Sequence, residues 1–462
     1  MELRHTSSLS EVIADFVMNF NPAEVPQGVR NHAKLLFIDA LGVAIAAYNL
    51  NHAHVVRKVA KSFNKSGEST LWGTRQKVSA PDAVLANGAL IHGLDFDDTH
   101  VAAIVHPSAC IVPTAFAIGE SVGAGGDDIL MAAICGYEIM IRLGLAAQGG
   151  FHDRGYHATG VLGAFASACV AARLLKVPCE VLVNALGICG SQAAALQEFL
   201  HDGSWVKKLH PGWASHSAIY ALNLAREGFT GPREVFEGGF GLWSTHLGFN
   251  EGIKDYFADL GNKWRTEEIS VKLYPCCHYL HSFIDCILYL QSAHKFTYKE
   301  IERVECRIDP RGFKIVCDPI SVKRRPTTDY AMRFSLPFAV AMALFRGRVG
   351  PQEFDAKYAG EQVVLDLMDK VECVADSGAE RPGHFPGWVK VFLSDGAVYE
   401  HIQKYERGCK ECPISETDVI QKFEINASIH LSQDRIERML QDIRRIEELD
   451  GIEPILEKMT IS

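Results

Sequence analysis

The sequence predicts a mainly α-helical protein, in which both chain ends build one large helical domain and a smaller α/β domain is inserted between them. Three observations lead to this fold class. The chain up to about Asp259 reads as one helix after another, rich in alanine and glycine. Beyond Asp259 the sequence changes to short alternating segments of β-prone residues, and the tail from Asp418 to Leu456 is helical again. We therefore expect residues 1–261 and 405–462 in the helical domain and 262–404 in the α/β domain.

The helices of the first half follow from apolar residues at helical spacing. Ser10 is expected to cap the first helix, and Ser69 to Gly73 to be extended. Ala80-Pro81-Asp82 is a good helix start, and that helix continues past Leu90. Small residues such as those of 160–168 suit tightly packed helices. The other predicted helices span 29–48, 55–63, 107–122, 127–148, 158–175, 179–200 and 214–227.

The inserted segment combines strands with apolar helices. Residues 388–393 alternate like a half-buried strand, Ser394-Asp395-Gly396 is a hairpin signal, and 398–401 return as a second strand. Further strands are predicted at 269–273, 304–308 and 371–374, and helices at 279–293, 333–345 and 362–368.

Composition excludes several classes of protein. With 48% hydrophobic and 22% charged residues, the chain resembles ordinary soluble globular proteins, and its net charge of −10 argues against a nucleic-acid partner. No apolar run is expected to be long and charge-free enough to span a membrane. The first residues, Met1 to His5, lack a signal-peptide core, so a cytoplasmic protein is predicted. The thirteen cysteines are therefore expected to be reduced thiols.

One stretch, Asn87 to Ser108, concentrates titratable groups. Three carboxylates, a hydroxyl and two imidazoles fall within a dozen positions: Asp95, Asp97, Asp98, Thr99, His100 and His106. Crowded carboxylates and imidazoles shift one another's pKa values, which is a common way of preparing an acid or a base. The alternative is a polar helix terminus in which Asp97 or Asp98 caps the next element.

Two further stretches could bind an anion. His157 stands at the start of a helix of small residues, where the N-terminus favours negative charge, although it could equally cap or pack that turn. Lys207, Lys208 and His210 precede what reads as a Pro211-Gly212 turn, and taken alone they would be a solvated basic loop.

Metal-binding patterns are incomplete. Cys276, Cys277, His278 and His281 crowd together but do not form the two separated ligand pairs of a tetrahedral zinc site. The Cys409–Cys412 pair has no thioredoxin-like context and is better explained by a tight turn. No metal site and no phosphate-binding loop are predicted.

Taken together, the motifs resemble the MmgE/PrpD family. The resemblance is carried in order along the chain by Gly93 to His100 with His106-Pro107-Ser108, by 155–160, 207–212, Lys272 ahead of Tyr274-Pro275, and 333–338. It implies a large helical domain, a smaller α/β lid domain, a homodimer and no metal or organic cofactor. The family includes 2-methylcitrate dehydratase, cis-aconitate decarboxylase and iminodisuccinate epimerase.

The resemblance also implies which residues form the site. The decarboxylase pattern places site residues at Asp95, Thr99, His106, His157, Lys207 and Lys272. His106 would transfer the proton, Lys207, Lys272 and His157 would hold substrate carboxylates, Asp95 would orient a neighbouring cation, and Thr99 would donate a hydrogen bond. Lys208, His210 and Arg333 are further candidates for binding substrate. A tyrosine of the pattern is replaced by Phe338, and the dehydratase pattern is less similar around Asp97 and 108–110.

The predicted function is a cofactor-independent enzyme that moves a proton at carbon next to a carboxylate of a small polycarboxylate. A carbon–carbon lyase similar to cis-aconitate decarboxylase is favoured. The alternatives left open are an epimerase of an iminodisuccinate-type substrate, a 2-methylcitrate dehydratase-type hydro-lyase, and a non-catalytic ligand-binding protein. Neither a nucleic acid nor a membrane is expected as a partner.

Overall fold

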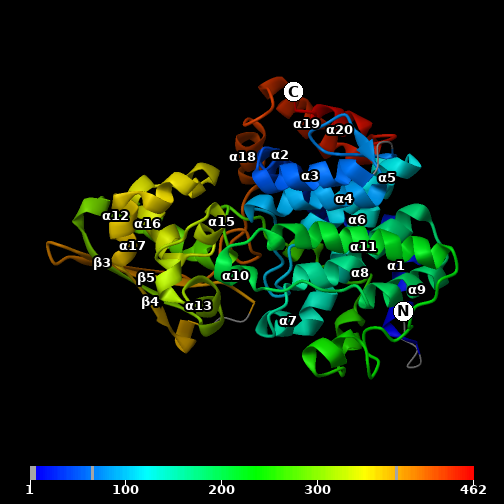
Figure 1. Ribbon diagram of the computed structural model, residues 1–462, viewed down its shortest axis with the longest axis horizontal. Coiled ribbons are helices and arrows are strands. Elements are labelled where there is room, and N and C mark those ends of the chain that lie inside the picture. Colours follow the sequence, from blue (N-terminus) through cyan, green and yellow to red (C-terminus); the bar gives the residue numbers. More distant parts are fainter. Residues whose placement is uncertain (1–6, 64–66, 380–382, 462) are drawn as a thin grey trace.

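The computed structural model describes residues 7–63, 67–379 and 383–461 and is mainly helical, as predicted. Figure 1 shows a large helical part beside a smaller part that contains the main sheet. The helices of the large part are α1 (Leu9–Asn19), α2 (Gln27–Ala46), α3 (Asn51–Phe63), α4 (Ala80–Ile91), α5 (Ser108–Val122), α6 (Gly126–Ala147), α7 (Gly150–Asp153), α8 (Ala158–Leu175), α9 (Cys179–Gly190), α10 (Phe199–Asp202), α11 (Val206–Arg226), α18 (Glu416–Ala427), α19 (Gln433–Arg444) and α20 (Glu453–Lys458).

The smaller part has a four-stranded sheet in the order β4-β3-β5-β6, with β3 and β4 parallel and the other pairs antiparallel. Its inward residues alternate along β5, as the sequence predicts. The elements are α12 (His281–His294), β3 (Ile301–Ile308), α13 (Pro310–Val316), α14 (Ile320–Lys323), α15 (Asp329–Met332), α16 (Leu336–Arg346), α17 (Gln362–Asp369), β4 (Val371–Ala375), β5 (Gly387–Leu393) and β6 (Val398–Gln403). A separate small sheet pairs β1 (Ser69–Thr70) with β2 (Lys77–Val78).

Buried apolar residues form two large clusters. One contains side chains from Leu9 to Val271 together with side chains from Val419 to Met459. The other contains side chains from Tyr274 to Leu393 and Val101. The C-terminal α18 packs against α2, and Figure 1 shows these two helices side by side. This arrangement supports our division into 1–261 with 405–462 and 262–404, which we keep as a proposal.

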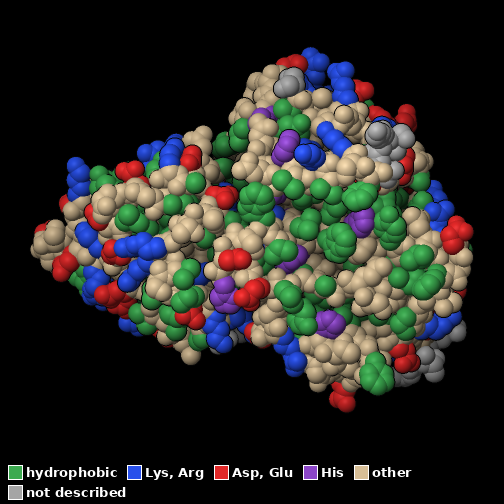
Figure 2. Space-filling model, viewed as in Figure 1, with side chains coloured by type: hydrophobic (Ala, Val, Ile, Leu, Met, Phe, Trp, Pro, Cys, Tyr) green, Lys and Arg blue, Asp and Glu red, His purple; other side chains and the backbone are tan. Residues whose placement is uncertain are grey.

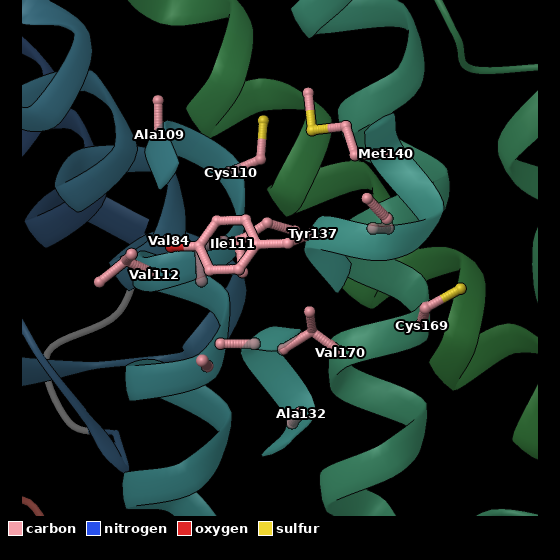
Figure 3. Close-up of a cluster of buried hydrophobic side chains, with 14 of the residues drawn as sticks. Val84, Ala109, Cys110, Ile111, Val112, Ala132, Tyr137, Met140, Cys169 and Val170 are labelled. Atoms are coloured by element: carbon pink, nitrogen blue, oxygen red, sulfur yellow. The ribbon is translucent and has the colours of Figure 1, made fainter. Parts of the chain in front are cut away.

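Small residues bring the central helices close together. Where α4 crosses α11, a Cβ added to Gly88 would lie 2.7 Å from the Cα of Gly212, so larger side chains would separate the two helices. Figure 3 shows the adjoining core, in which Tyr137 of α6 lies against Ile111 of α5 and Val170 comes from α8. This packing explains the high alanine and glycine content of the first half.

Several predicted boundaries are wrong. Ser8, and not Ser10, caps α1, because its hydroxyl and the Glu11 side chain form a capping box. The predicted helix 179–200 ends at Gly190. Residues 269–273 form one bridge to Thr99 in place of a strand. The Pro211-Gly212 turn is also absent: α11 runs through it, since packing of Gly212 against α4 holds the helix despite the proline.

The expectation that no apolar run is long enough to cross a membrane is also wrong. Among the described residues, α6 and α8 are long and apolar enough by length and composition. In the structure, 94% and 89% of their most apolar windows are buried inside the protein, which accounts for their composition. Absence of a membrane partner and a cytoplasmic location stay predictions, and Met1 to His5 lie outside the described residues. All thirteen cysteines are free thiols, as predicted.

Candidate active site

A small cavity lies between the two parts of the molecule, near α10 in Figure 1. The cavity has a volume of about 60 Å³, which is enough for a small molecule. Its wall joins residues of the helical part to residues of the α/β part: Asp95, Thr99, Ile104, His106, His152, His157, Gln197, Phe199, Leu200, Lys207, Lys272, Cys277, His278, Tyr279, Ile315, Phe334 and Phe385. Six of the nine predicted site residues are among them.

Asp95 owes its position to a tight turn. The helix α4 is followed by a 3-10 turn, His92 to Leu94, and Asp95 then adopts the left-handed conformation, with φ 52° and ψ 36°. Aspartate tolerates this region better than most residues do. The turn ends the helical path and leaves the fully buried carboxylate at the cavity wall.

Two lysines from distant elements meet at this carboxylate. Lys207 Nζ of α11 lies 2.9 Å from Asp95 Oδ1, and Lys272 Nζ lies 3.0 Å from the same atom and 2.9 Å from the Asp95 carbonyl oxygen. Burial by itself would raise the pKa of Asp95, but the two ammonium groups lower it well below its usual range. Two positive charges thus face one negative charge, and this trio can attract a further carboxylate.

The hydrogen bonds of His106 indicate its tautomer. Its Nδ1 lies 2.8 Å from the carbonyl oxygen of Asp98, which can only accept, so Nδ1 carries the proton. Nδ1 also lies 3.1 Å from the Thr99 hydroxyl oxygen. Burial and the charge of Lys272 lower the pKa of His106 well below its usual range, so the ring is neutral. Its Nε2 therefore has a free lone pair that can accept a proton.

Asp98 holds the His106 ring in place through its backbone carbonyl group. Its carboxyl group accepts from the backbone N–H and the hydroxyl of Ser108, at 3.1 and 2.5 Å, so Asp98 caps the start of α5 as the alternative interpretation predicts. Burial raises the pKa of Asp98 to about 8, and its carboxyl is protonated at neutral pH. The same residue thus anchors the helix start and offers its carbonyl to the imidazole.

His157 also reaches the cavity, from the residue before α8. Burial and Lys207 lower the pKa of His157 well below its usual range. Its Nδ1 lies 3.2 Å from Nδ1 of His210 in α11. His106 and His157 are thus two of the four neutral imidazoles on the cavity wall, with His152 and His278, and their ring centroids are 5.9 Å apart.

Three predicted binding residues do not line the cavity. Lys208 points toward Asp329, at 3.7 Å, and over the ring of Tyr330. Arg333 donates to the carbonyl oxygens of Leu94, at 3.0 Å, and of Pro275, and so ties the two parts of the molecule together behind the site. His210 lies behind His157. Phe338 is also elsewhere, buried in the α/β core.

Sequence reasoning missed His92. Its Nδ1 lies 2.7 Å from Asp97 Oδ2, both side chains are fully buried, and its ring packs 5.1 Å from that of His106. Burial would raise the pKa of Asp97, but this imidazole, with His106 and Lys272, lowers it to about 2. The sequence could have indicated this residue, because His92 lies within the stretch from Asn87 to Ser108, at the end of a helix.

Two side-chain groups in the described part of the chain have the spacing of metal ligands. His92, Asp95 and Asp97 form one group, but the two lysines already occupy Asp95. The other comprises His384, Glu406 and Cys409, and its His384 Nδ1 lies 3.3 Å from Glu406 Oε1, an ordinary ion-pair contact. From the sequence we considered Cys409 only as a pair with Cys412, and His384 and Glu406 were not considered as its partners.

Residues 11–251 match the MmgE/PrpD N-terminal domain, and residues 274–446 match the MmgE/PrpD C-terminal domain. The cis-aconitate decarboxylase of Aspergillus terreus is 26% identical over 98% of this chain and 96% of the relative. The human cis-aconitate decarboxylase is 25% identical over 96% and 92%. The 2-methylcitrate dehydratase of Cupriavidus necator is 24% identical over 85% and 84%.

Proposed function

The chain belongs to the MmgE/PrpD family, and on this premise we propose that it is a lyase that removes carbon dioxide from a small polycarboxylate without a cofactor. The relatives named as cis-aconitate decarboxylases support this reaction type. The observation that carries the proposal is the buried trio of Asp95, Lys207 and Lys272 beside His106, in a cavity of small-molecule size.

The lysines bind the substrate and stabilise the charge that develops on it. Two ammonium groups face a single carboxylate in a buried site, where an anion would interact with them more strongly than in water. Asp95 keeps both ammonium groups in place before the substrate arrives, so little reorganisation is needed during the reaction. In the bond-breaking step, one carboxylate leaves as carbon dioxide and its electron pair remains on carbon next to another carboxylate, held by the lysines.

His106 is assigned the proton transfer that completes the reaction. The carbon that holds the electron pair takes one proton from Nε2, while Nδ1 keeps its bond to the Asp98 carbonyl. His106 must gain that proton first, and the negative charge of Asp97 raises the pKa of His106 toward this state. Bound substrate carboxylates act in the same direction.

A hydro-lyase of the 2-methylcitrate dehydratase type is the second candidate. It is favoured by the neutral His106, because a ring with a free Nε2 lone pair is ready to remove a proton from carbon next to a carboxylate. The dehydratase of Cupriavidus necator is among the relatives. The comparisons give no support to the epimerase alternative.

We also infer a homodimer, and exposed apolar side chains toward the end of α11 support it. Tyr220 and Leu224 lie one helical turn apart and are 53% and 41% exposed. Figure 2 shows hydrophobic side chains gathered on this face of the helical part. A second copy of the chain would cover them.

The reaction type is tested by offering cis-aconitate and 2-methylcitrate to the purified protein. Carbon dioxide release and the absorbance of the product double bond are followed in parallel. Carbon dioxide release from cis-aconitate supports the decarboxylase, and double-bond formation from 2-methylcitrate without carbon dioxide supports the hydro-lyase. Turnover of neither acid would contradict both proposals.

A further inference from the structure

Two histidines lie next to each other in the wall of the cavity. Their Nδ1 atoms are 3.2 Å apart, and the ring centroids of His157 and His210 are 5.4 Å apart. Gly160 allows this contact, because a Cβ at that position would lie 3.0 Å from the His210 Cβ and 2.5 Å from the Ala195 Cβ. The glycine therefore lets α11 approach the start of α8 closely enough for the two rings to share a hydrogen bond.

The two rings face different spaces. His157 lines the enclosed cavity, and its buried Nε2 has no hydrogen-bond partner within the described ranges. His210 lines a separate groove on the outer surface, together with Glu198 and Asp202. Phe199 lines both spaces and packs on both rings, at centroid distances of 6.5 and 6.1 Å. The histidine pair thus spans the wall between the cavity and the outer groove.

The proposed decarboxylation consumes a proton in every turnover. The substrate carboxylate leaves as neutral carbon dioxide, the electron pair stays on carbon, and one proton must come from solvent to form the new C–H bond. The cavity is small and its wall is buried, so His106 needs a route by which this proton can be replaced.

We propose that His157 and His210 form a proton path that recharges His106 from the outer groove, an inference that rests on the proposed decarboxylase function. His210 takes a proton from groove water at Nε2 and passes its Nδ1 proton to Nδ1 of His157. His157 releases its Nε2 proton into the cavity, and one water molecule carries it to Nε2 of His106. Every ring accepts one proton and gives one, so both members of the pair stay neutral. Each ring ends with its other nitrogen protonated and turns about its Cβ–Cγ bond before the next proton passes.

The contacts and charges around the pair suit such a transfer. Burial, His92 and Lys207 lower the pKa of His210 to about 3, and burial and Lys207 likewise keep His157 neutral. A neutral imidazole has one donor and one acceptor nitrogen, which is what a relay requires. His106 and His157 both line the cavity, with ring centroids 5.9 Å apart, so a single water between their Nε2 atoms would complete the path.

The test replaces His210 by alanine and follows the first and later turnovers of cis-aconitate by rapid mixing. Nε2 of resting His106 carries no proton, so every turnover needs the path, the first included. All turnovers of the variant should slow by about tenfold or more, with no burst of product. Added imidazole should enter the groove and restore turnover in a saturable way. His210→Phe, which fills the space, should show the same slowing without rescue.

His152→Ala is the matched control, because His152 also lines the cavity and packs 6.3 Å from His157 but has no second imidazole behind it among the described residues. Any slowing in this variant should show no rescue by imidazole. Steady-state turnover of His210→Ala at the wild-type rate would overturn the path, and so would slow turnover that imidazole does not restore. Inactivity of the wild type instead contradicts the proposed function.

Discussion

Replacing Lys207 by alanine should weaken substrate binding far more than it slows the chemical step. Its ammonium group lies 2.9 Å from Asp95 and borders the cavity, where a substrate carboxylate would meet it. The same charge contact holds the bound substrate and the transition state, so its loss acts mainly through KM.

The size of the effect follows from the contacts that remain. A hydrogen bond to a charged group contributes about 1.5–3 kcal/mol, and since 1.36 kcal/mol corresponds to a factor of ten, KM should rise about 10- to 150-fold. Lys272 keeps two contacts with Asp95, so the carboxylate is not left unpaired. The free energy of unfolding should therefore fall by no more than about 3 kcal/mol, the lower end for breaking a buried ion pair.

Lys208→Ala provides the matched control. Lys208 is the next residue of α11 and equally buried, but its ammonium group faces Asp329 and Tyr330, away from the cavity. Its loss should lower stability and leave KM near the wild-type value. Steady-state kinetics give KM and kcat, and urea unfolding gives stability. An unchanged KM in Lys207→Ala, or an equal rise in both variants, would refute the reasoning.

Four further predictions concern other parts of the molecule. His106→Gln should lower kcat by about 10²–10⁴-fold with a smaller effect on KM, and a near-normal kcat would remove His106 from the reaction. Because burial raises the pKa of Asp98 to about 8, its protonated form stabilises the fold below the unfolded pKa of about 4, and that stabilisation is lost as the pH rises toward 8. Between about pH 5 and pH 8, the free energy of unfolding measured in urea should therefore fall less in Asp98→Asn than in the wild type. An equal fall in both proteins would argue against a buried protonated carboxyl. Chelator treatment should leave activity unchanged, whereas stoichiometric zinc in elemental analysis, with activity lost on its removal, would reverse this view. Tyr220→Glu should convert a dimer into a monomer in light scattering, and a monomeric wild type would contradict the homodimer.

Much of the fold could be predicted from local patterns. Small and apolar residues at helical spacing located α8 at its observed bounds, and alternation with a hairpin signal located β5 and β6. Boundaries failed where tertiary contacts outweigh local preference. The prediction for 206–212 treated Pro211 as a helix breaker, but close packing of Gly212 on α4 keeps α11 continuous through it.

By itself, the sequence determined that titratable groups gather between Asn87 and Ser108 and that cations stand at 207–210, because residue identity and spacing are local properties. Tertiary structure alone decided which of them share the cavity. Successive helix residues point about 100° apart, so Lys207 meets Asp95 while Lys208 faces Asp329. His210 is likewise turned to the outer groove, behind His157. That choice depends on how α11 packs against α4 and α8, and no local pattern encodes the rotation of one helix against another.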